Sequence, residues 1–461
     1  MAKPKLNLFF LSLIAISLLS LLLFLSHRSC SFSHFRDLKN PYPTPPKIAY
    51  FITGSDGDGP RILRLLQAVY HPRNQYLLHL DFHASQQQRE DLAVSIQSTE
   101  TFTVSENVNV VGNADSVNYR GPTSISLVLR GAAILLRYSK DWDWFVNLGA
   151  WDYPLITQDD FLHVLSFMPK DFNFIEHTSS IGWNEYQRMI QIVVDPSLYL
   201  ASKGAMFMGD GKRTLPKAYK FFTGSPSMLL SRKLIEFSIL GWENLPRTLL
   251  MYFANTRSSN RGYFQTLACN SKEFSDIIVN NNLWFIAWDN PPTTEPRNLR
   301  SSDLKKMLGS GAAFAGSFLP NDRVLDMIDQ QVLHRKQGRV APGGWCVGSH
   351  DRGRDPCKFR GDIDILRPGP AAKRFVKLLL RLNLYIRIQS SPKSHLHLYV
   401  CSVTKDTWIN HNSKTTCSSK WVGAVGLCSP AWYARKICRM QITTAVVVVV
   451  CMDKQGYRYL N

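Results

Sequence analysis

Apolar runs alternate with amphipathic stretches after residue 46. Lys47–Thr53 (KIAYFIT), Gln75–Leu80 and Trp144–Leu148 are predicted to be buried strands. Between them, Arg61–Tyr70 and Thr123–Tyr138 carry apolar residues at helical spacing. This alternation is typical of an α/β fold with a mostly parallel central sheet covered on both faces. The remaining predicted elements are strands at Val108–Val111, Phe174–Glu176 and Met228–Leu230 and a helix at Arg232–Gly241.

The N-terminus carries an uncharged run of twenty residues, Leu6–Leu25, after Lys3 and Lys5. About 20 apolar residues cross the hydrocarbon core of a bilayer, whereas the apolar part of a cleaved signal peptide has roughly 7–15. We therefore expect a membrane anchor rather than a cleaved signal peptide, with the two lysines on the cytoplasmic side.

This anchor and the composition along the chain together predict the domain organisation. The rest of the chain is expected in the lumen, because a single anchor with a cytoplasmic N-terminus places it there. The predicted segments are a cytoplasmic tail at 1–5, a transmembrane signal anchor at 6–25, a proline-rich stem at 26–46, a lumenal body at 47–370 and a basic extension at 371–461.

The net charge of +19 is concentrated in the extension. Residues 371–461 hold 14 Lys/Arg and 2 Asp/Glu, which accounts for +12. The extension has neither a zinc-finger spacing nor a heptad-bearing basic region, so no nucleic-acid partner is expected. Nine cysteines in a lumenal chain favour disulfides. Cys346 and Cys357, close together in a Gly- and Arg-rich loop, are the best candidate pair.

Polar residues follow three of the predicted strands. A glycine-rich turn from Gly54 to Gly59 follows the first, Asp81 ends the second, and Asp152 follows Trp144–Leu148. Ligands of parallel sheets bind at the carboxyl ends of the strands, so these residues are candidate ligand contacts. The spacing of the turn matches neither the dinucleotide fingerprint nor a P-loop, and an ordinary surface turn remains the alternative. Asp81 has its own alternative role, as a cap of the following turn.

Asp141-Trp-Asp143 resembles the D-x-D pair by which many sugar transferases hold a divalent metal. This pair precedes its strand, whereas a metal pair is expected at the carboxyl end, where only Asp152 is available. A single carboxylate is a poor divalent site, so no metal and no other cofactor is expected. The charge of a sugar diphosphate would then be met by Arg, Lys or helix N-termini.

Several stretches in order resemble the plant branch of glycosyltransferase family 14, the core-2/I-branching acetylglucosaminyltransferase-like family with its β-glucuronosyltransferase subgroup. They cover about Lys47 to Pro370. The stretches are Tyr70-His-Pro-Arg-Asn-Gln-Tyr76, His79-Leu-Asp81, Asp141-Trp-Asp-Trp-Phe145, Asp152-Tyr-Pro-Leu155, Asn173-Phe-Ile-Glu-His177, Val194-Asp-Pro196, Asn244-Leu-Pro-Arg-Thr248, Gly262-Tyr-Phe264, Ala287-Trp-Asp-Asn-Pro-Pro292 and Pro342-Gly-Gly-Trp-Cys346.

The resemblance implies a variant GT-A-like nucleotide-sugar-binding fold and an inverting, metal-independent transferase that uses a UDP-sugar. It implies a body at 47–370 that is glycosyltransferase-like. Carried over by position, Asp81, Tyr119 and Arg297 are expected nucleotide-sugar contacts, which Gly54 and Asp152 join from their place at the strand ends. The expected acceptor contacts are Trp183, Glu185 and Trp288. Core packing is the alternative role for any single tryptophan.

The chain departs from the family pattern around the expected site. The pattern places the catalytic Glu directly before Gly-Tyr-Phe, where this chain has Arg261, and arginine cannot accept a proton. The catalytic base is thus unassigned, with Glu185 and Asp289 as fallback candidates. The basic pair after Phe-Ala is replaced by Gly316-Ser317, and Ser-Ala-Ser before Asp-Tyr-Pro is replaced by Gly149-Ala-Trp151.

The expected protein is a single-pass type II Golgi membrane glycosyltransferase. It would transfer glucuronic acid from UDP-glucuronate to galactan chains of arabinogalactan glycoproteins, components of the plant cell wall. UDP-xylose and UDP-N-acetylglucosamine remain alternative donors. A second hypothesis is a catalytically impaired relative that binds a glycan or helps to assemble a complex. The sequence does not determine the oligomeric state.

Overall fold

The residues that the computed structural model describes in full are 43–199, 205–241, 243–291, 295–348 and 355–382. The predicted tail and anchor, and the stem before residue 43, lie outside them, as does most of the extension. Within the described part, no helix is long and apolar enough to cross a membrane.

The chain divides into two units. One comprises Tyr42–Thr415, and the other combines Met1–Pro41 with Thr416–Asn461. In the second unit, β15 (Gln441–Thr443) pairs with β16 (Val446–Val448) in an antiparallel arrangement. All candidate site residues belong to the first unit, which the following paragraphs describe.

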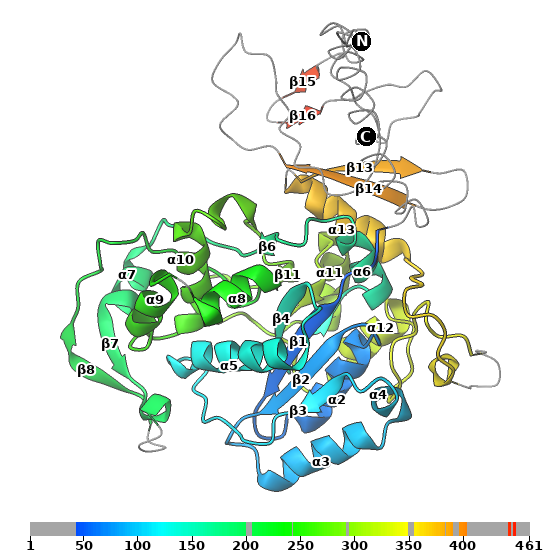
Figure 1. Ribbon diagram of the computed structural model, residues 1–461, viewed down its shortest axis with the longest axis horizontal. Coiled ribbons are helices and arrows are strands. Elements are labelled where there is room, and N and C mark those ends of the chain that lie inside the picture. Colours follow the sequence, from blue (N-terminus) through cyan, green and yellow to red (C-terminus); the bar gives the residue numbers. More distant parts are fainter. Residues whose placement is uncertain are drawn as a thin grey trace, which may run out of the picture. The chain divides into compact units, whose positions relative to one another are not determined.

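A seven-stranded sheet forms the centre of the first unit (Figure 1). β1 pairs in parallel with β2 on one side and with β4 on the other, and β2 pairs in parallel with β3. β9 is antiparallel to β4 and β6, and β10 is parallel to β6. In sheet order the strands are β10 (Ile278–Val279), β6 (Asn173–Phe174), β9 (Leu229–Ser231), β4 (Trp144–Gly149), β1 (Ile48–Gly54), β2 (Gln75–Leu80) and β3 (Val108–Val110).

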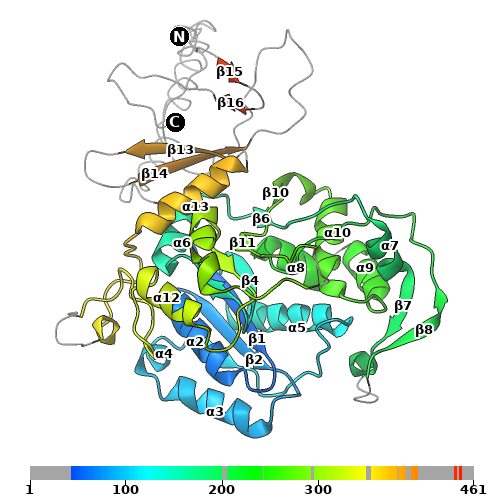
Figure 2. The ribbon, with the colours of Figure 1, turned by 180° about the vertical axis from the view of Figure 1, so that it is seen from behind.

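Helices cover both faces of this sheet (Figures 1 and 2). One face packs against α2 (Gly59–Val69), α3 (Gln86–Gln97), α4 (Glu100–Thr103), α6 (Gln158–Leu165), α11 (Leu304–Ser310), α12 (Arg323–Gln331) and α13 (Pro370–Arg381). The opposite face packs against α5 (Thr123–Tyr138), α7 (Trp183–Ile190), α8 (Arg232–Leu240), α9 (Leu245–Phe253) and α10 (Tyr263–Asn270).

Side chains of β1 alternate between the two cores, because successive residues of a strand point to opposite faces. Tyr50 and Ile52 belong to the first core and Ala49 and Phe51 to the second, and all seven residues of β1 are buried. This double burial explains why the strand is a continuous apolar run in the sequence.

Smaller elements surround the central sheet. A second sheet has the order β11 (Trp284–Phe285), β12 (Phe314–Ala315) and β5 (Tyr153–Pro154). Two antiparallel pairs are formed by β7 (Gln191–Val194) with β8 (Phe207–Lys212), and by β13 (Leu384–Ser390) with β14 (Leu396–Ser402). The 3-10 turns are η2 (Pro196–Tyr199), η3 (Ser259–Arg261), η4 (Ser275–Ile277), η5 (Ser301–Asp303) and η7 (Pro356–Lys358).

The predicted α/β class with a mostly parallel central sheet is confirmed. The body, however, does not stop at the predicted boundary of 370. α13 begins at that residue and buries Phe375 and Leu379 in the core beside α6. Asp160 of α6 also accepts hydrogen bonds from the Gly369 and Ala372 amides, at 2.6 and 3.1 Å. The apolar face of α13 therefore makes it part of the body.

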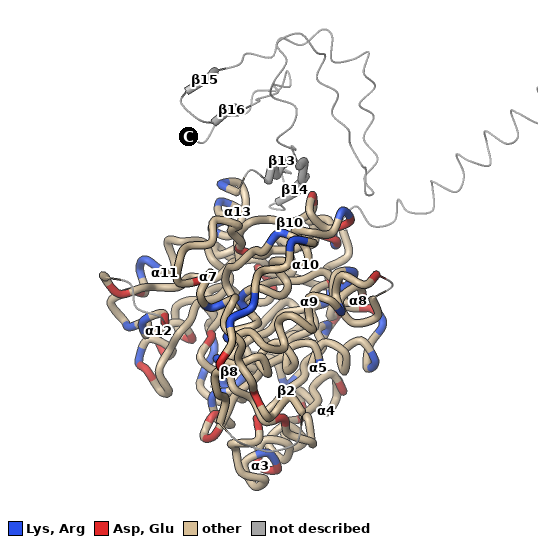
Figure 3. The backbone as a smooth tube through the Cα atoms, turned by 90° about the vertical axis from the view of Figure 1, so that its left-hand side faces the viewer, with Lys and Arg blue, Asp and Glu red and all other residues tan. Residues whose placement is uncertain are grey.

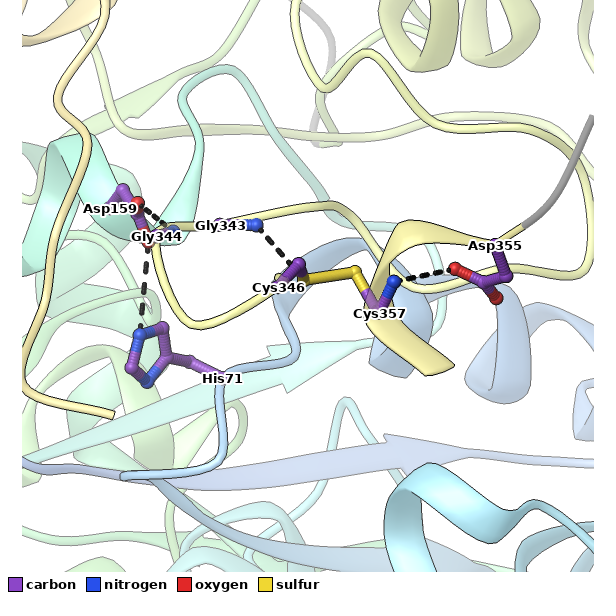
Figure 4. The surroundings of a disulfide bond; sticks show 7 residues. All are labelled: His71, Asp159, Gly343, Gly344, Cys346, Asp355 and Cys357. Carbon is purple, nitrogen blue, oxygen red and sulfur yellow. Dashed lines mark hydrogen bonds and ion pairs between the residues drawn. A yellow bond between two sulfur atoms is a disulfide. The ribbon is translucent and has the colours of Figure 1, made fainter. Parts of the chain in front are cut away.

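The predicted disulfide between Cys346 and Cys357 is present (Figure 4). It links a glycine-rich loop to the η7 turn, where Asp355 accepts a hydrogen bond from the Cys357 amide at 3.0 Å. Asp159 of α6 accepts one from the Gly344 amide at 2.7 Å. The loop is thus attached both to its own downstream segment and to α6.

Candidate active site

The carboxyl ends of β1, β2 and β4 meet at one edge of the sheet. Gly54 of β1 pairs with Leu80 of β2, and Thr53 pairs with Gly149 of β4. The Gly54 carbonyl accepts hydrogen bonds from the Asp81 amide at 3.0 Å and from the Tyr119 hydroxyl at 3.4 Å. Three of the predicted nucleotide-sugar contacts are therefore adjacent.

Asp81 is completely buried, yet one of its carboxylate oxygens has no partner. Its Oδ1 accepts hydrogen bonds from the Ser55 hydroxyl at 3.0 Å and from the His83 amide at 2.9 Å. Oδ2 is buried and receives none. A buried acceptor left unsatisfied costs roughly 1–3 kcal/mol, more when it is charged, so a ligand donor at Oδ2 would be favourable. A nucleoside N–H or a ribose hydroxyl is such a donor.

The glycine-rich turn after β1 is filled by one of its own carboxylates. Asp58 Oδ2 accepts the Ser55 amide at 3.0 Å, and Asp58 Oδ1 receives the Arg61 guanidinium at 2.7 Å. An anion bound in this turn would face that carboxylate. The geometry favours the ordinary turn over a phosphate cradle, and it leaves Gly54 as a contact of Asp81 and Tyr119.

Asp152 is buried at the end of β4, where its Oδ2 accepts the Gly149 amide at 2.8 Å. It lines a small cavity of about 30 Å³ together with Arg61, Arg64 and Tyr153. Burial raises the pKa of Asp152 to about 7, although the Gly149 hydrogen bond, Trp284 and Arg61 oppose the shift. This cavity is large enough for a water molecule.

We expect the stability of the protein to report the titration of Asp152. Its pKa is 3.8 in the unfolded chain and about 7 in the folded one, so folding takes up a proton in this range. The free energy of unfolding therefore falls as pH rises from 4 to 8, by up to about 4 kcal/mol from this group. Asp152→Asn removes that component. Denaturant unfolding of both proteins across the range measures the difference, and parallel pH profiles would contradict the assignment.

Asp141 and Asp143 lie at the opposite, amino edge of the sheet. Asp143 accepts the Lys47 amide at 2.9 Å and pairs with Lys170 at 2.9 Å, and Asp141 pairs with the Lys47 ammonium. Since these carboxylates flank the starts of β1 and β4, they are remote in the fold from the carboxyl edge. Among the described residues, no group of three or more His, Cys, Asp or Glu is arranged to hold a metal.

Arg261 lies against Glu185, one of the fallback bases. Its Nη2 is 3.9 Å from Glu185 Oε1, while Glu185 Oε2 accepts Arg188 Nε at 2.8 Å and the Thr223 hydroxyl at 3.1 Å. Burial raises the pKa of Glu185, but Arg188, Arg261 and Thr223 more than offset it, and the net pKa is lowered. Glu185 is thus an ionised but weakened base. The i,i+3 spacing of Glu185 and Arg188 was the available sequence signal for this pair.

The turn that carries Arg261 adjoins the loop that carries Tyr119. The Ser258 amide donates to the Arg120 carbonyl at 2.9 Å, and the Ser259 hydroxyl donates to the Pro122 carbonyl at 3.1 Å. These bonds join η3 to the start of α5, which follows the carboxyl edge. Arg261 and Glu185 therefore belong to the same side of the sheet as Asp81 and Tyr119.

The remaining predicted contacts differ in their surroundings. Arg297 forms a two-pronged ion pair with Asp303, at 2.7 and 2.8 Å, so a diphosphate would compete with that carboxylate. Trp183 is 73% exposed and Trp288 is 45% exposed, as stacking surfaces must be. Asp289 is also exposed, and none of the described contacts joins it to Arg261 or Glu185.

Comparisons with known proteins identify relatives of this chain. The family model of the Core-2/I-Branching enzyme matches residues 48–308. Beta-glucuronosyltransferase GlcAT14A of Arabidopsis thaliana is 49% identical over 74% of this chain and 76% of its own, and GlcAT14C of the same plant is 45% identical over 74% and 83%. Xylosyltransferase 1 of Rattus norvegicus is 28% identical over 54% of this chain and 28% of its own.

The chain belongs to the core-2/I-branching enzyme family. The prediction of the family and that of a glycosyltransferase are thereby confirmed. The two departures from the expected family pattern, at 149–151 and 316–317, both adjoin the carboxyl edge of the sheet.

Gly149 and Trp151 compensate for each other within this family site. A Cβ on Gly149 would lie 2.3 Å from the Trp151 ring, so the indole occupies space that a serine there would need. The same ring packs edge-on against Tyr119, with 5.5 Å between centroids. The bulk of Trp151 is thus accommodated by the glycine and lies directly beside the expected nucleoside contact.

We expect Gly149→Ala to destabilise the protein by about 1–3 kcal/mol, because it overpacks the site against the indole. In a Trp151→Ala background, Gly149→Ala is expected to cost less, because the indole that its methyl group would meet is absent. Denaturant unfolding of the two single variants and the double variant gives the coupling free energy. Additive effects would show that the two residues do not compensate.

Gly316 has a similar relation to Asp152. A Cβ at this position would lie 2.4 Å from Asp152 Oδ1, so the carboxylate occupies the space of a side chain there. The expected basic pair is Gly316-Ser317 in this chain, and the glycine adjoins a buried carboxylate. Burial is what raises the pKa of that carboxyl group.

Proposed function

We propose that the protein transfers glucuronic acid from UDP-glucuronate to galactan chains of arabinogalactan proteins, with inversion at the anomeric carbon and without a metal. The observation that carries the proposal is the 45–49% identity to three beta-glucuronosyltransferases over about three quarters of the chain. The geometry supports it with a buried, partly unsatisfied Asp81 beside Tyr119 at the carboxyl edge.

In this reaction an acceptor hydroxyl attacks the anomeric carbon of the donor. The bond from oxygen to that carbon forms, the bond from the carbon to the diphosphate breaks, and UDP leaves. A carboxylate takes the hydroxyl proton. Of the two fallback bases, Glu185 is the better placed, since it contacts the residue at the family's base position. Arg61 and Arg64 supply two cations to the lining of the cavity beside Asp152.

We further propose a Golgi membrane location, with the run at 6–25 as a type II signal anchor. The length of that run and Lys3 and Lys5 before it support this orientation. A fluorescent protein fused after residue 46 tests it. Golgi fluorescence that is protected from protease added to sealed vesicles is expected, and a diffuse or secreted fusion would contradict the anchor.

The activity itself is tested with the purified full chain, galactan oligosaccharides and UDP-glucuronate in EDTA. Transfer of glucuronic acid is expected, at a higher rate than transfer from UDP-xylose or UDP-N-acetylglucosamine. Transfer from only one of those two donors would support a glycosyltransferase activity but would show that UDP-glucuronate is not its donor.

A second candidate function is a catalytically impaired relative that binds a glycan or a partner enzyme. Arg261 favours it, because the base position holds a cation that also weakens Glu185. No turnover of any of the three donors, with galactan binding retained, would establish this second function.

A further inference from the structure

Two guanidinium groups share one carboxylate beside the expected acceptor side of the site. Arg188 binds Glu185 directly, at 2.8 Å, and also donates to the Ser258 carbonyl at 3.2 Å. Arg261 has a single side-chain contact among the described residues, the 3.9 Å approach to Glu185. One negative charge thus faces two positive charges, and the pair formed with Arg188 is the closer one.

The hydrogen-bond donors of this cluster are incompletely satisfied. Arg188 Nη2 and Arg261 Nε are both buried without an acceptor. The Arg188 side chain is 10% exposed, whereas that of Arg261 is 36% exposed. Arg261 is therefore the member that can present a guanidinium edge to a ligand. A planar guanidinium matches the geometry of a carboxylate, which it binds through two parallel hydrogen bonds.

An aromatic surface lies on the same helix. Trp183 and Tyr186 of α7 stack on each other, with 6.1 Å between ring centroids, and both are exposed. Glu185 and Arg188 occupy the same two turns. The two pairs lie on different sides of α7, because residues three apart share one side of a helix and 183/186 are offset from 185/188. Figure 3 shows basic and acidic positions along the backbone on this side of the molecule, where α7 and β8 are labelled.

We propose that Arg261, which lies beside Glu185 and Arg188, binds the carboxylate of a hexuronic acid. This inference rests on the proposed function and names a ligand of the same site. The carboxylate has two sources, the glucuronosyl group of the donor and a uronosyl residue already present on the acceptor. Because the single carboxylate of Glu185 pairs more closely with Arg188, the positive charge of Arg261 is not fully neutralised.

The test is ligand binding, which does not depend on turnover. Isothermal titration of the purified full chain uses methyl β-glucuronoside with methyl β-glucoside as its neutral match, and UDP-glucuronate with UDP-glucose. The wild type is expected to prefer the acidic ligand of at least one pair. Arg261→Gln is expected to weaken that ligand by roughly tenfold or more and to leave its neutral match unchanged, because charge-assisted hydrogen bonds are lost.

Two further variants secure the interpretation. Glu185→Gln removes the competing carboxylate and is expected to tighten the acidic ligand several-fold, which also tests the site if Arg261→Gln fails to fold. Arg137→Gln removes an exposed positive charge at the end of α5 and is expected to change nothing. If Arg261→Gln loses affinity for methyl β-glucuronoside, the ligand is a uronosyl group of the acceptor. If it loses affinity for UDP-glucuronate alone, the ligand is the donor.

Equal affinity of wild type and Arg261→Gln for both acidic ligands would overturn the inference. So would an equal loss for acidic and neutral ligands, since this would indicate a structural role for Arg261. Arg261-dependent binding without any glucuronosyl transfer would instead refute the proposed function and leave this site standing.

Discussion

Arg261→Glu is expected to raise the rate constant for glucuronosyl transfer by about 10²-fold, the lower end of what a general base contributes. The substitution places a carboxylate at the family's base position. It also removes one of the two cations that lower the pKa of Glu185. Initial rates at saturating UDP-glucuronate and galactan measure the effect. The Michaelis constant of the uronate-bearing substrate is expected to rise at the same time, because the guanidinium is lost.

Arg261→Gln is the matched control for this experiment. It removes the cation without supplying a base, so its rate is expected to stay within several-fold of the wild type. If the rate rose equally in the Gln and Glu variants, the cause would be the removal of the cation that lowers the pKa of Glu185. If neither gained, position 261 would not be the place of the base in this chain.

Asp329→Asn is expected to destabilise the protein by about 3–5 kcal/mol, because it leaves buried cations without their counter-charge. Asp329 is buried in α12 and accepts hydrogen bonds from Arg64 at 2.7 Å, from the Tyr153 hydroxyl at 2.6 Å and from Arg335 Nε at 2.6 Å. Arg335 is also buried. Denaturant unfolding of the purified full chain, followed by tryptophan fluorescence, measures the loss.

A neighbouring residue provides the control for that prediction. Asp326 of the same helix also binds Arg64 at 2.7 Å, but its side chain is 54% exposed. Exposed ion pairs contribute little, so Asp326→Asn is expected to cost less than about 1 kcal/mol. Equal losses in the two variants would show that burial does not determine the strength of this network. Since Arg64 and Tyr153 line the cavity beside Asp152, the network also fixes one wall of the site.

The central sheet was predictable because its strands are buried on both faces. β1, β2 and β4 are mostly apolar, with Gln75, His79 and Asn147 among the exceptions, and each predicted range agrees with the structure to within one residue at either end. α3 was not predicted, because only Leu92 and Ile96 of its twelve residues are buried and its polar face obscures the helical period. α13 lies beyond the predicted boundary at 370 because its apolar face packs on the core although its composition is basic.

The site was predictable only in part. Asp81, Tyr119 and Gly54 lie together because they follow the ends of parallel strands, a relation that topology determines. Asp58 filling the glycine-rich turn, and the compensation between Gly149 and Trp151, depend on side-chain positions. A strand pattern does not contain that information.

The central claim is that the UDP-sugar binds at the carboxyl edge, through Asp81, and not at the D-x-D sequence of the amino edge. The most direct measurement is the affinity of the full chain for UDP, in EDTA, for the wild type, Asp81→Asn and Asp141→Asn. Each variant removes one carboxylate charge, so the two are matched. We predict a loss of roughly tenfold or more for Asp81→Asn and no change for Asp141→Asn. An unchanged affinity for Asp81→Asn, or a loss confined to Asp141→Asn, would contradict the account.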